Sequence, residues 1–160
     1  MTMDIKNSRG FTIVEVLVSM VILSFGVLGL GVLQLTSLQN TQGGYLRSQA
    51  TILAYDIVDS MRANIPAVTG GDYRITFTAE TLATVDCYDS EIDCSTNQMA
   101  SADLKRWRTV LSNYLPAGNG QVGTVNIAGT TQVTVEITWV DPYSVESGNE
   151  QMVLLAELPQ

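Results

Sequence analysis

The stretch Phe11-Thr12-Ile13-Val14-Glu15-Val16-Leu17-Val18, which continues without another charged residue to Leu35, decides the fold of this chain. Its 25 residues carry one charge, on Glu15. At about 1.5 Å per residue they form a helix of roughly 37 Å, long enough to cross the ~30 Å hydrocarbon core of a bilayer. Lys6 and Arg9 precede the stretch, and Arg47 is the next basic residue. The positive-inside rule therefore predicts a single membrane span with a cytoplasmic N-terminus and an extracytoplasmic domain.

Two ordinary explanations of such a segment were weighed. A secretory signal peptide has a 7–15-residue apolar core followed by a small-x-small cleavage site, whereas this core is longer and no such site follows it. A plain signal anchor accounts for the length but not for Glu15. A carboxylate inside a membrane segment costs about 2.5–3.5 kcal/mol on insertion scales and indicates a function. The alternative is that Glu15 reaches the interface or takes up a proton.

The composition excludes several classes of function. The 160 residues include 8 Lys+Arg and 16 Asp+Glu, a net charge of −8, and no His. Lys105, Arg106 and Arg108 form the one basic cluster, which argues against nucleic-acid binding. Without His, Ser-His-Asp and Cys-His catalysis and most zinc sites are excluded. We therefore expect no enzyme, no catalytic residue, no cofactor and no metal.

The hexapeptide Gly10-Phe11-Thr12-Ile13-Val14-Glu15, after a short basic leader, resembles the class III signal of type IV prepilins. The resemblance implies that prepilin peptidase removes residues 1–10 between Gly10 and Phe11 and that the new Phe11 amine is N-methylated. Glu15 then pairs with the Phe11 amine of a neighbouring subunit, because a buried charge is tolerated only when paired. Such a pair sets the axial register of assembly.

The helix is expected to continue as an amphipathic segment over residues 36–64. Apolar residues follow at helical spacing, and Asp59 and Arg62 form a possible i,i+3 pair. The apolar positions are Leu46, Ala50, Leu53, Ile57 and Met61, with a second set at intervals of seven at Leu38, Tyr45 and Ile52. Pro66 ends the helix near Asn64. The glycines at 26, 29, 31, 43 and 44 indicate either close helix packing or a hinge.

The head, residues 65–160, is predicted to contain a turn at 68–72 and a short strand at 73–78. Cys87 and Cys94 lie on the extracytoplasmic side with six residues between them, which favours one disulfide. Asp86, Asp89, Glu91 and Asp93 surround them. We interpret these acids as a solvated loop and keep a calcium site as the alternative.

One helix and a three-stranded meander complete the head. Leu104, Trp107, Leu111 and Leu115 share one face of a helix over 101–115 and are expected in the core, while the neighbouring basic side chains remain available to an acidic partner. Strands are predicted at 121–127, 131–140 and 151–158, the second with Val133, Val135, Ile137 and Trp139 inward. The fold class is α+β: a pilin fold, with a long N-terminal transmembrane and amphipathic helix packed on a small antiparallel sheet.

Further segments are similar to the type IV pilus modification protein V family of minor pilins. They include residues 45–51, Met61-Arg62-Ala63-Asn64 and Leu115-Pro116-Ala117-Gly118-Asn119-Gly120. This resemblance implies an inner-membrane protein with a periplasmic head. It implies partnership with other minor pilins, the major pilin, prepilin peptidase and the assembly platform. It also implies a place in the pilus, at its tip, and a role in priming pilus assembly, pilus display, twitching motility and adhesion.

Three alternatives remain at this stage. A minor pseudopilin of type II secretion has the same N-terminal signal. A pilus-tip adhesin or DNA-uptake subunit has the same architecture, although the acidic charge disfavours DNA binding. A single-pass sensor anchor unrelated to pili would keep its first ten residues.

Overall fold

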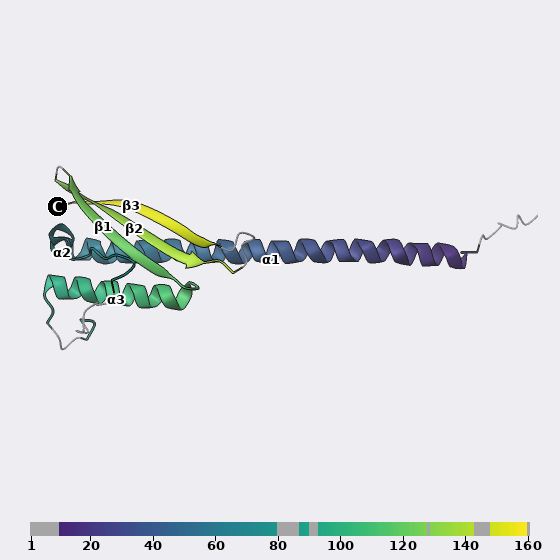
Figure 1. Ribbon diagram of the computed structural model, residues 1–160, viewed down its shortest axis with the longest axis horizontal. Helices are drawn as coiled ribbons and strands as arrows, with labels where there is room; N and C mark the ends of the chain where they lie inside the picture. The colour runs from purple at the N-terminus through teal and green to yellow at the C-terminus, as the bar shows by residue number, and fades with distance from the viewer. Residues whose placement is uncertain (1–9, 80–86, 90–92, 128, 143–147, 160) are drawn as a thin grey trace, which may run out of the picture. The chain divides into compact units, whose positions relative to one another are not determined.

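The computed structural model describes residues 10–79, 87–89, 93–127, 129–142 and 148–159. Its elements in chain order are α1 (Ile13–Ala63), α2 (Ile65–Gly70), α3 (Thr96–Tyr114), β1 (Asn119–Ile127), β2 (Thr130–Val140) and β3 (Asn149–Pro159) (Figure 1). A long helix with a three-stranded antiparallel sheet confirms the α+β pilin fold. The chain divides into two compact units, Met1–Gln39 and Asn40–Gln160, which we describe separately.

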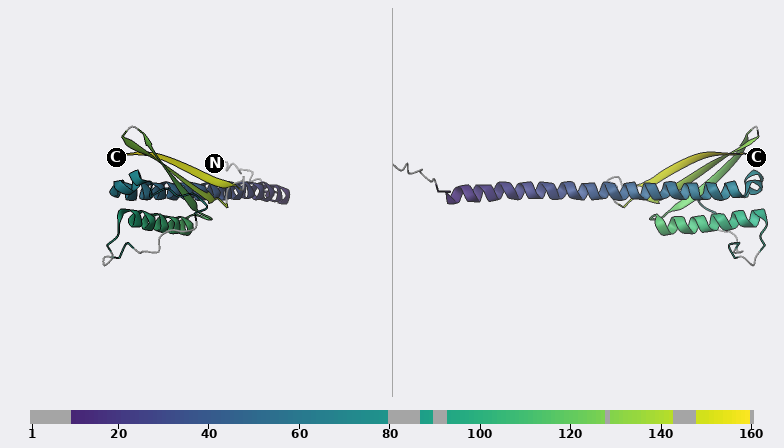
Figure 2. Two further views of the ribbon diagram at one scale, coloured as in Figure 1. Left: turned by 60° about the vertical axis from the view of Figure 1, so that its left-hand side comes forward. Right: turned by 180° about the vertical axis from the view of Figure 1, so that it is seen from behind.

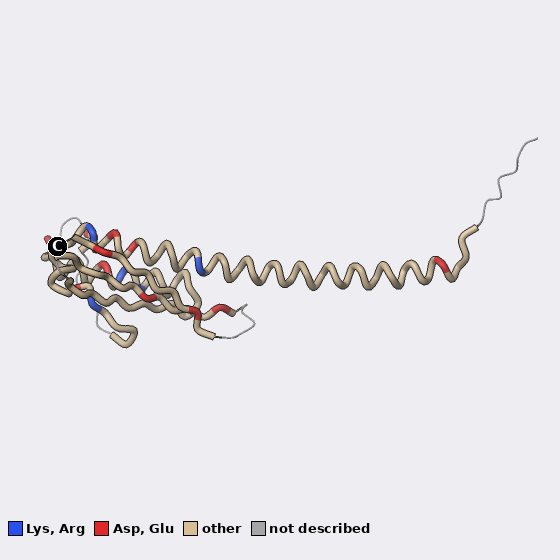
Figure 3. Tube along the Cα trace, turned by 90° about the horizontal axis from the view of Figure 1, so that it is seen from above, with Lys and Arg blue, Asp and Glu red and all other residues tan. Residues whose placement is uncertain are grey.

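The first unit consists of the N-terminal part of α1. Between Glu15 and Arg47 the helix carries no charged residue, which Figure 3 shows as an uninterrupted tan coil. The few hydroxyl groups bond to the helix itself: Ser19 donates to the Glu15 carbonyl at 2.7 Å and Ser24 to the Met20 carbonyl at 2.7 Å. Such i−4 bonds satisfy these two hydroxyl donors within the helix. By length and composition α1 is able to cross a membrane, with a window of mean hydropathy 2.6.

The second unit is built on the C-terminal part of α1, with the sheet and α3 packed along it (Figures 1 and 2). The predicted apolar stripe is buried, together with two further residues; the buried set is Leu46, Ala50, Leu53, Ala54, Ile57, Val58 and Met61. Trp107 of α3 is fully buried and its Nε1 donates to the Leu53 carbonyl at 2.8 Å. This bond ties α3 directly to the α1 backbone.

The sheet has the order β1-β2-β3 and is antiparallel throughout. Its inner face is apolar, as the alternation predicted: Val122, Val135 and Leu154 are paired across the three strands. The inward residues of β2, at 133, 135, 137 and 139, are at most 2% exposed. The ends of the three strands lie within two residues of the predicted limits.

Three local predictions were wrong. Residues 68–70 of the turn expected at 68–72 belong to helix α2, which Pro66 opens near its first position, and the turn itself lies at 71–73. The strand expected at 73–78 is reduced to one bridge, Ile75 with Val122, and the Thr76 carbonyl beside that bridge accepts from Arg108 instead of from a second strand.

The helix expected over 101–115 begins five residues earlier than predicted and ends at Tyr114. α3 begins at Thr96, where the Gln98 side chain accepts a hydrogen bond from the Ser95 N–H at 2.9 Å. The pair Ser95-x-x-Gln98 is a capping-box signal, which marks this start of the helix in the sequence.

Candidate functional site

The start of α1 holds the three residues expected to direct processing and assembly. Thr12 caps the helix: its Oγ1 accepts from the Glu15 N–H at 3.3 Å and its carbonyl accepts from the Val16 N–H at 3.3 Å. Glu15 therefore lies in the first turn, where the positive end of the helix dipole favours a carboxylate. Gly10 and Phe11 precede the helix and are exposed, and no atom lies within 4 Å of where a Gly10 side chain would stand.

The apolar part of α1 is uncovered. Large apolar side chains from Phe11 to Leu38 have exposed fractions between 43% and 81%. Exposed apolar patches of this size mark contact with a membrane or with other proteins. The second set of apolar positions is also exposed, since Tyr45 and Ile52 are 53% and 60% accessible. The part of α1 from Phe11 to Leu38 thus presents an apolar surface that a bilayer or neighbouring helices have to cover.

The glycines of α1 fall into two groups. A side chain at Gly26, Gly29 or Gly31 would meet nothing within 4 Å, so no contact inside the described chain requires them. A Cβ at Gly43 would lie 2.7 Å from Oδ2 of Asp141, the residue that follows β2. Gly43 therefore allows the end of the sheet to approach the helix closely.

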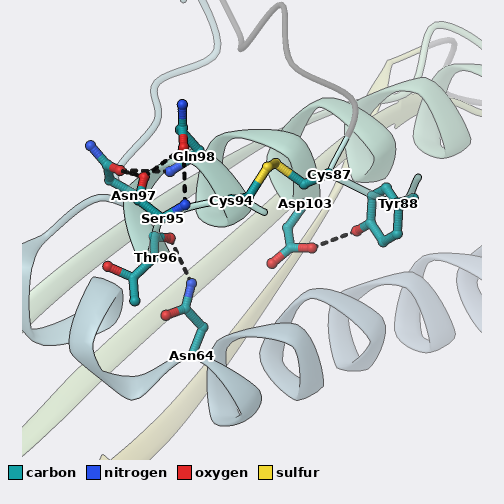
Figure 4. The surroundings of a disulfide bond; sticks show 9 residues. All are labelled: Asn64, Cys87, Tyr88, Cys94, Ser95, Thr96, Asn97, Gln98 and Asp103. Atoms are coloured by element: carbon teal, nitrogen blue, oxygen red, sulfur yellow. Dashed lines mark hydrogen bonds between the residues drawn. A yellow bond between two sulfur atoms is a disulfide. The ribbon is translucent and has the colours of Figure 1, made fainter. Parts of the chain in front are cut away.

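The disulfide between Cys87 and Cys94 is present, as predicted. It lies beside a buried carboxylate that sequence reasoning had not singled out as functional. Asp103 of α3 is 5% exposed; its Oδ1 accepts from the Tyr88 hydroxyl at 2.5 Å and its Oδ2 from the Tyr73 hydroxyl at 2.5 Å. Figure 4 shows Tyr88 pointing from the disulfide toward Asp103. The bridge thereby fixes a tyrosine onto α3.

This polar cluster extends to α1. Arg106 donates to the Tyr88 hydroxyl at 3.0 Å, lies 5.4 Å from the centroid of its ring, and contacts Asp56 of α1 at 3.2 Å. Burial, and then Asp103, raise the pKa of Tyr88 to about 12 and also raise the pKa of Tyr73. Both phenols therefore remain protonated donors at neutral pH. The cluster joins α1, α3 and the disulfide loop, which is a structural role.

Two of the three basic residues of α3, Arg106 and Arg108, have partners within the chain. Arg106 has Asp56, and the predicted pair of Asp59 with Arg62 is confirmed at 2.6 Å. Arg108 donates to the Ala79 carbonyl at 2.5 Å and to the Gly120 carbonyl at 3.1 Å. Arg108 thereby holds the segment around Ala79 beside the start of β1.

The motif from Leu115 to Gly120 has a steric explanation. A Cβ at Gly118 would lie 2.4 Å from the Leu111 carbonyl, and one at Gly120 would lie 2.3 Å from the ring of Trp107. Only glycine permits this close passage from α3 to β1. The loop is also tied to the sheet, because Val140 N–H donates to the Pro116 carbonyl at 2.8 Å.

The acidic loop is only partly described. Asp86 and Glu91 lie outside the described residues, so the calcium alternative is not tested by the structure. Among the residues that the structure does describe, no group of three or more His, Cys, Asp or Glu side chains is placed to hold a metal ion.

Comparison with known families gives two adjoining matches. The prokaryotic N-terminal methylation motif matches residues 5–31, and the family described as type IV pilin Tt1218 matches residues 32–105. Pilin families are structural proteins rather than enzymes. Searches of curated proteins and of solved structures gave no significant match. The similarity to modification protein V therefore stays a prediction, while the methylation motif, the pilin match and the observed fold together support a type IV pilin.

Proposed function

We propose that the protein is a minor pilin that co-assembles with other minor pilins to prime type IV pilus assembly, and so supports pilus display, twitching motility and adhesion. The observation that carries the proposal is the surface of α1 from Phe11 to Leu38, which is apolar and exposed and begins with a first turn that Thr12 caps and that holds Glu15. The head has an apolar core of its own, whereas the apolar side chains from Phe11 to Leu38 are exposed. Exposed apolar side chains of this kind suit association with other subunits. Its activity is then binding rather than chemistry.

In this proposal prepilin peptidase cuts between Gly10 and Phe11 and the Phe11 amine is methylated. The exposed, non-helical position of both residues supports access by a peptidase. Removal of residues 1–10 takes away Lys6, Arg9 and Asp4, leaving 6 basic and 15 acidic residues, 6 − 15 = −9 before the new amine is counted.

Glu15 is proposed to fix the axial register by pairing with the Phe11 amine of a neighbour. Its place in the first turn offers a purely local role as well, because a carboxylate there stabilises the helix by about 0.3–1 kcal/mol. Two variants separate the roles. Glu15→Gln removes the charge and keeps the shape, whereas Thr12→Ala removes the cap and keeps the charge. We expect Glu15→Gln to lower incorporation into filaments at least tenfold and Thr12→Ala to leave it within threefold. Equal effects would mean that Glu15 acts only by stabilising the first turn of the helix.

The proposed role in initiation is tested by deletion of the gene. Surface pili and twitching are expected to disappear and pili to return when retraction is also disabled, since a priming subunit is not a building block of the whole filament. Pili that remain absent without retraction would contradict priming. Normal pili with a defect in protein secretion would favour the minor pseudopilin, and normal pili with loss of attachment alone would favour the tip adhesin.

A further inference from the structure

The outer face of the sheet, turned away from the core, carries an apolar group. Val153 and Leu155 of β3 are 52% and 74% exposed, and Val125 of β1 is 58% exposed. Strand pairing places Leu155 opposite Thr134 of β2, with the Thr134 methyl-bearing side chain between the two outer strands. These side chains contribute nothing to the core of the head, so their exposure calls for an explanation outside the chain.

Beside this group the face has a hollow of about 210 Å³. It lies at Gly123 of β1, which is paired with Thr134, and Gln121, Thr134 and Glu136 are among the residues that line it. A Cβ at Gly123 would meet nothing within 4 Å, and its backbone is not in the left-handed region. Neither packing nor conformation therefore requires glycine at this point in the strand, where glycine weakens pairing.

The carboxylate of Glu136, at the edge of the hollow, is held in one orientation by two hydrogen bonds. Gln121 of β1 donates to one oxygen of Glu136, and Gln151 of β3 donates to the other. Each carboxylate oxygen keeps a second lone pair, so the group remains able to accept the forked donors of a guanidinium. Because its rotamer is already fixed from both sides, little conformational entropy is lost when a partner binds.

The charge of this outer face indicates the chemistry of the partner that it can bind. The three strands contain Glu136, Glu150 and Glu157 and no Lys or Arg. Glu150 is already paired with Arg47 of α1 at 3.3 Å, which leaves Glu136 and Glu157 on outward positions. A second copy of the same face would bring like charges together, which disfavours self-association. A complementary surface has an apolar centre and a basic side chain.

We propose that the outer face of β1, β2 and β3 is a docking surface for the head of a different pilin subunit. An arginine or lysine of that subunit occupies the hollow over Gly123 and contacts Glu136, while an apolar neighbour packs on Val153 and Leu155. The inference rests on the proposed function only for the kind of partner; the chemistry of the surface is independent of it.

The test places a photoactivated cross-linker, p-benzoyl-phenylalanine, in the full-length protein in its host cell. The probe replaces Val125 on the outer face or, as a control of equal 58% exposure, Tyr114 at the end of α3. Adducts are identified by mass spectrometry of the joined peptides. Gly123→Val fills the hollow, Glu136→Lys reverses the charge, and Thr130→Val is the matched control elsewhere on the same face.

The Val125 probe is expected to join to a second pilin subunit at a peptide that contains Arg or Lys. Gly123→Val and Glu136→Lys each lower the adduct yield at least tenfold, and Thr130→Val leaves it within twofold. Changing the partner's basic residue to Glu restores the yield with Glu136→Lys. The proposal is overturned if the adduct yield does not change in these variants. It is also overturned if the Val125 probe joins to a second copy of the chain or to lipid, or if only the Tyr114 probe gives adducts. N-terminal processing and filament recovery, read in the same cells, report the proposed function separately.

Discussion

The two units of this chain differ in whether their apolar side chains are exposed or buried. In the first, to Gln39, large apolar side chains remain exposed and the glycines have open space around them. In the second, apolar residues of α1, α3 and the sheet form one core, in which Tyr73 donates to the buried Asp103 and Trp107 donates to the Leu53 carbonyl. The head is complete as a single chain, whereas the N-terminal helix is complete only in a membrane or an assembly.

The largest expected contrast comes from truncating one aromatic side chain in each unit. Trp107→Ala removes a fully buried ring and its bond to the Leu53 carbonyl, and lowers the free energy of unfolding by about 3–5 kcal/mol. Phe25→Ala, at a side chain 72% exposed, changes the unfolding of the head by less than about 0.5 kcal/mol. Denaturant unfolding of the full chain in detergent, followed by near-UV circular dichroism, measures both. Equal losses would contradict the division.

The disulfide is expected to give the next largest effect. Replacing Cys87 and Cys94 by Ser opens a short loop, for which the chain-entropy relation gives about 2.5 kcal/mol. The same change releases Tyr88 from its place beside Asp103. The free energy of unfolding of the double variant should equal that of the reduced wild type. A variant as stable as the oxidised wild type would contradict a stabilising role of the disulfide and of the Tyr88 contact that it holds in place.

Two glycines of the same strand sharpen the account of the head. Gly120→Ala forces a methyl group onto the Trp107 ring and should destabilise the protein by about 1–3 kcal/mol. Gly123→Ala has open space and should be neutral or slightly stabilising, because glycine weakens a strand. Thermal unfolding of the pair tests this directly. A neutral Gly120→Ala would mean that the passage from α3 to β1 is not tight.

The smallest effect is a dependence on alkaline pH. The pKa of Tyr88 is raised from about 10 to about 12, so the folded state keeps a proton that the unfolded state loses. The stabilisation is complete below pH 10 and is lost as pH rises through about 12. Tyr88→Phe should flatten the fall in stability over that window, measured by denaturant midpoints at successive pH values. An unchanged slope would contradict the hydrogen bond from Tyr88 to Asp103.

The sequence was sufficient to predict those elements in which apolar residues recur at the regular spacing of a helix or a strand. The span of α1, its buried stripe from Leu46 to Met61 and the alternation of β2 follow from spacing alone. Asp103 could not be found in this way, because its partners Tyr73 and Tyr88 are 30 and 15 residues away and meet it only in the folded head. The prediction of a strand at 73–78 was wrong for a similar reason, since the distant Arg108 donates to the Thr76 carbonyl within it.

The most direct test of the central claim, that the exposed apolar helix is a processed pilin N-terminus, is the intact mass of the chain recovered from sheared surface filaments. We expect it to begin at Phe11 with a methylated amine and to retain the disulfide between Cys87 and Cys94. A chain that keeps residues 1–10 and remains in the membrane without entering any filament would contradict the account.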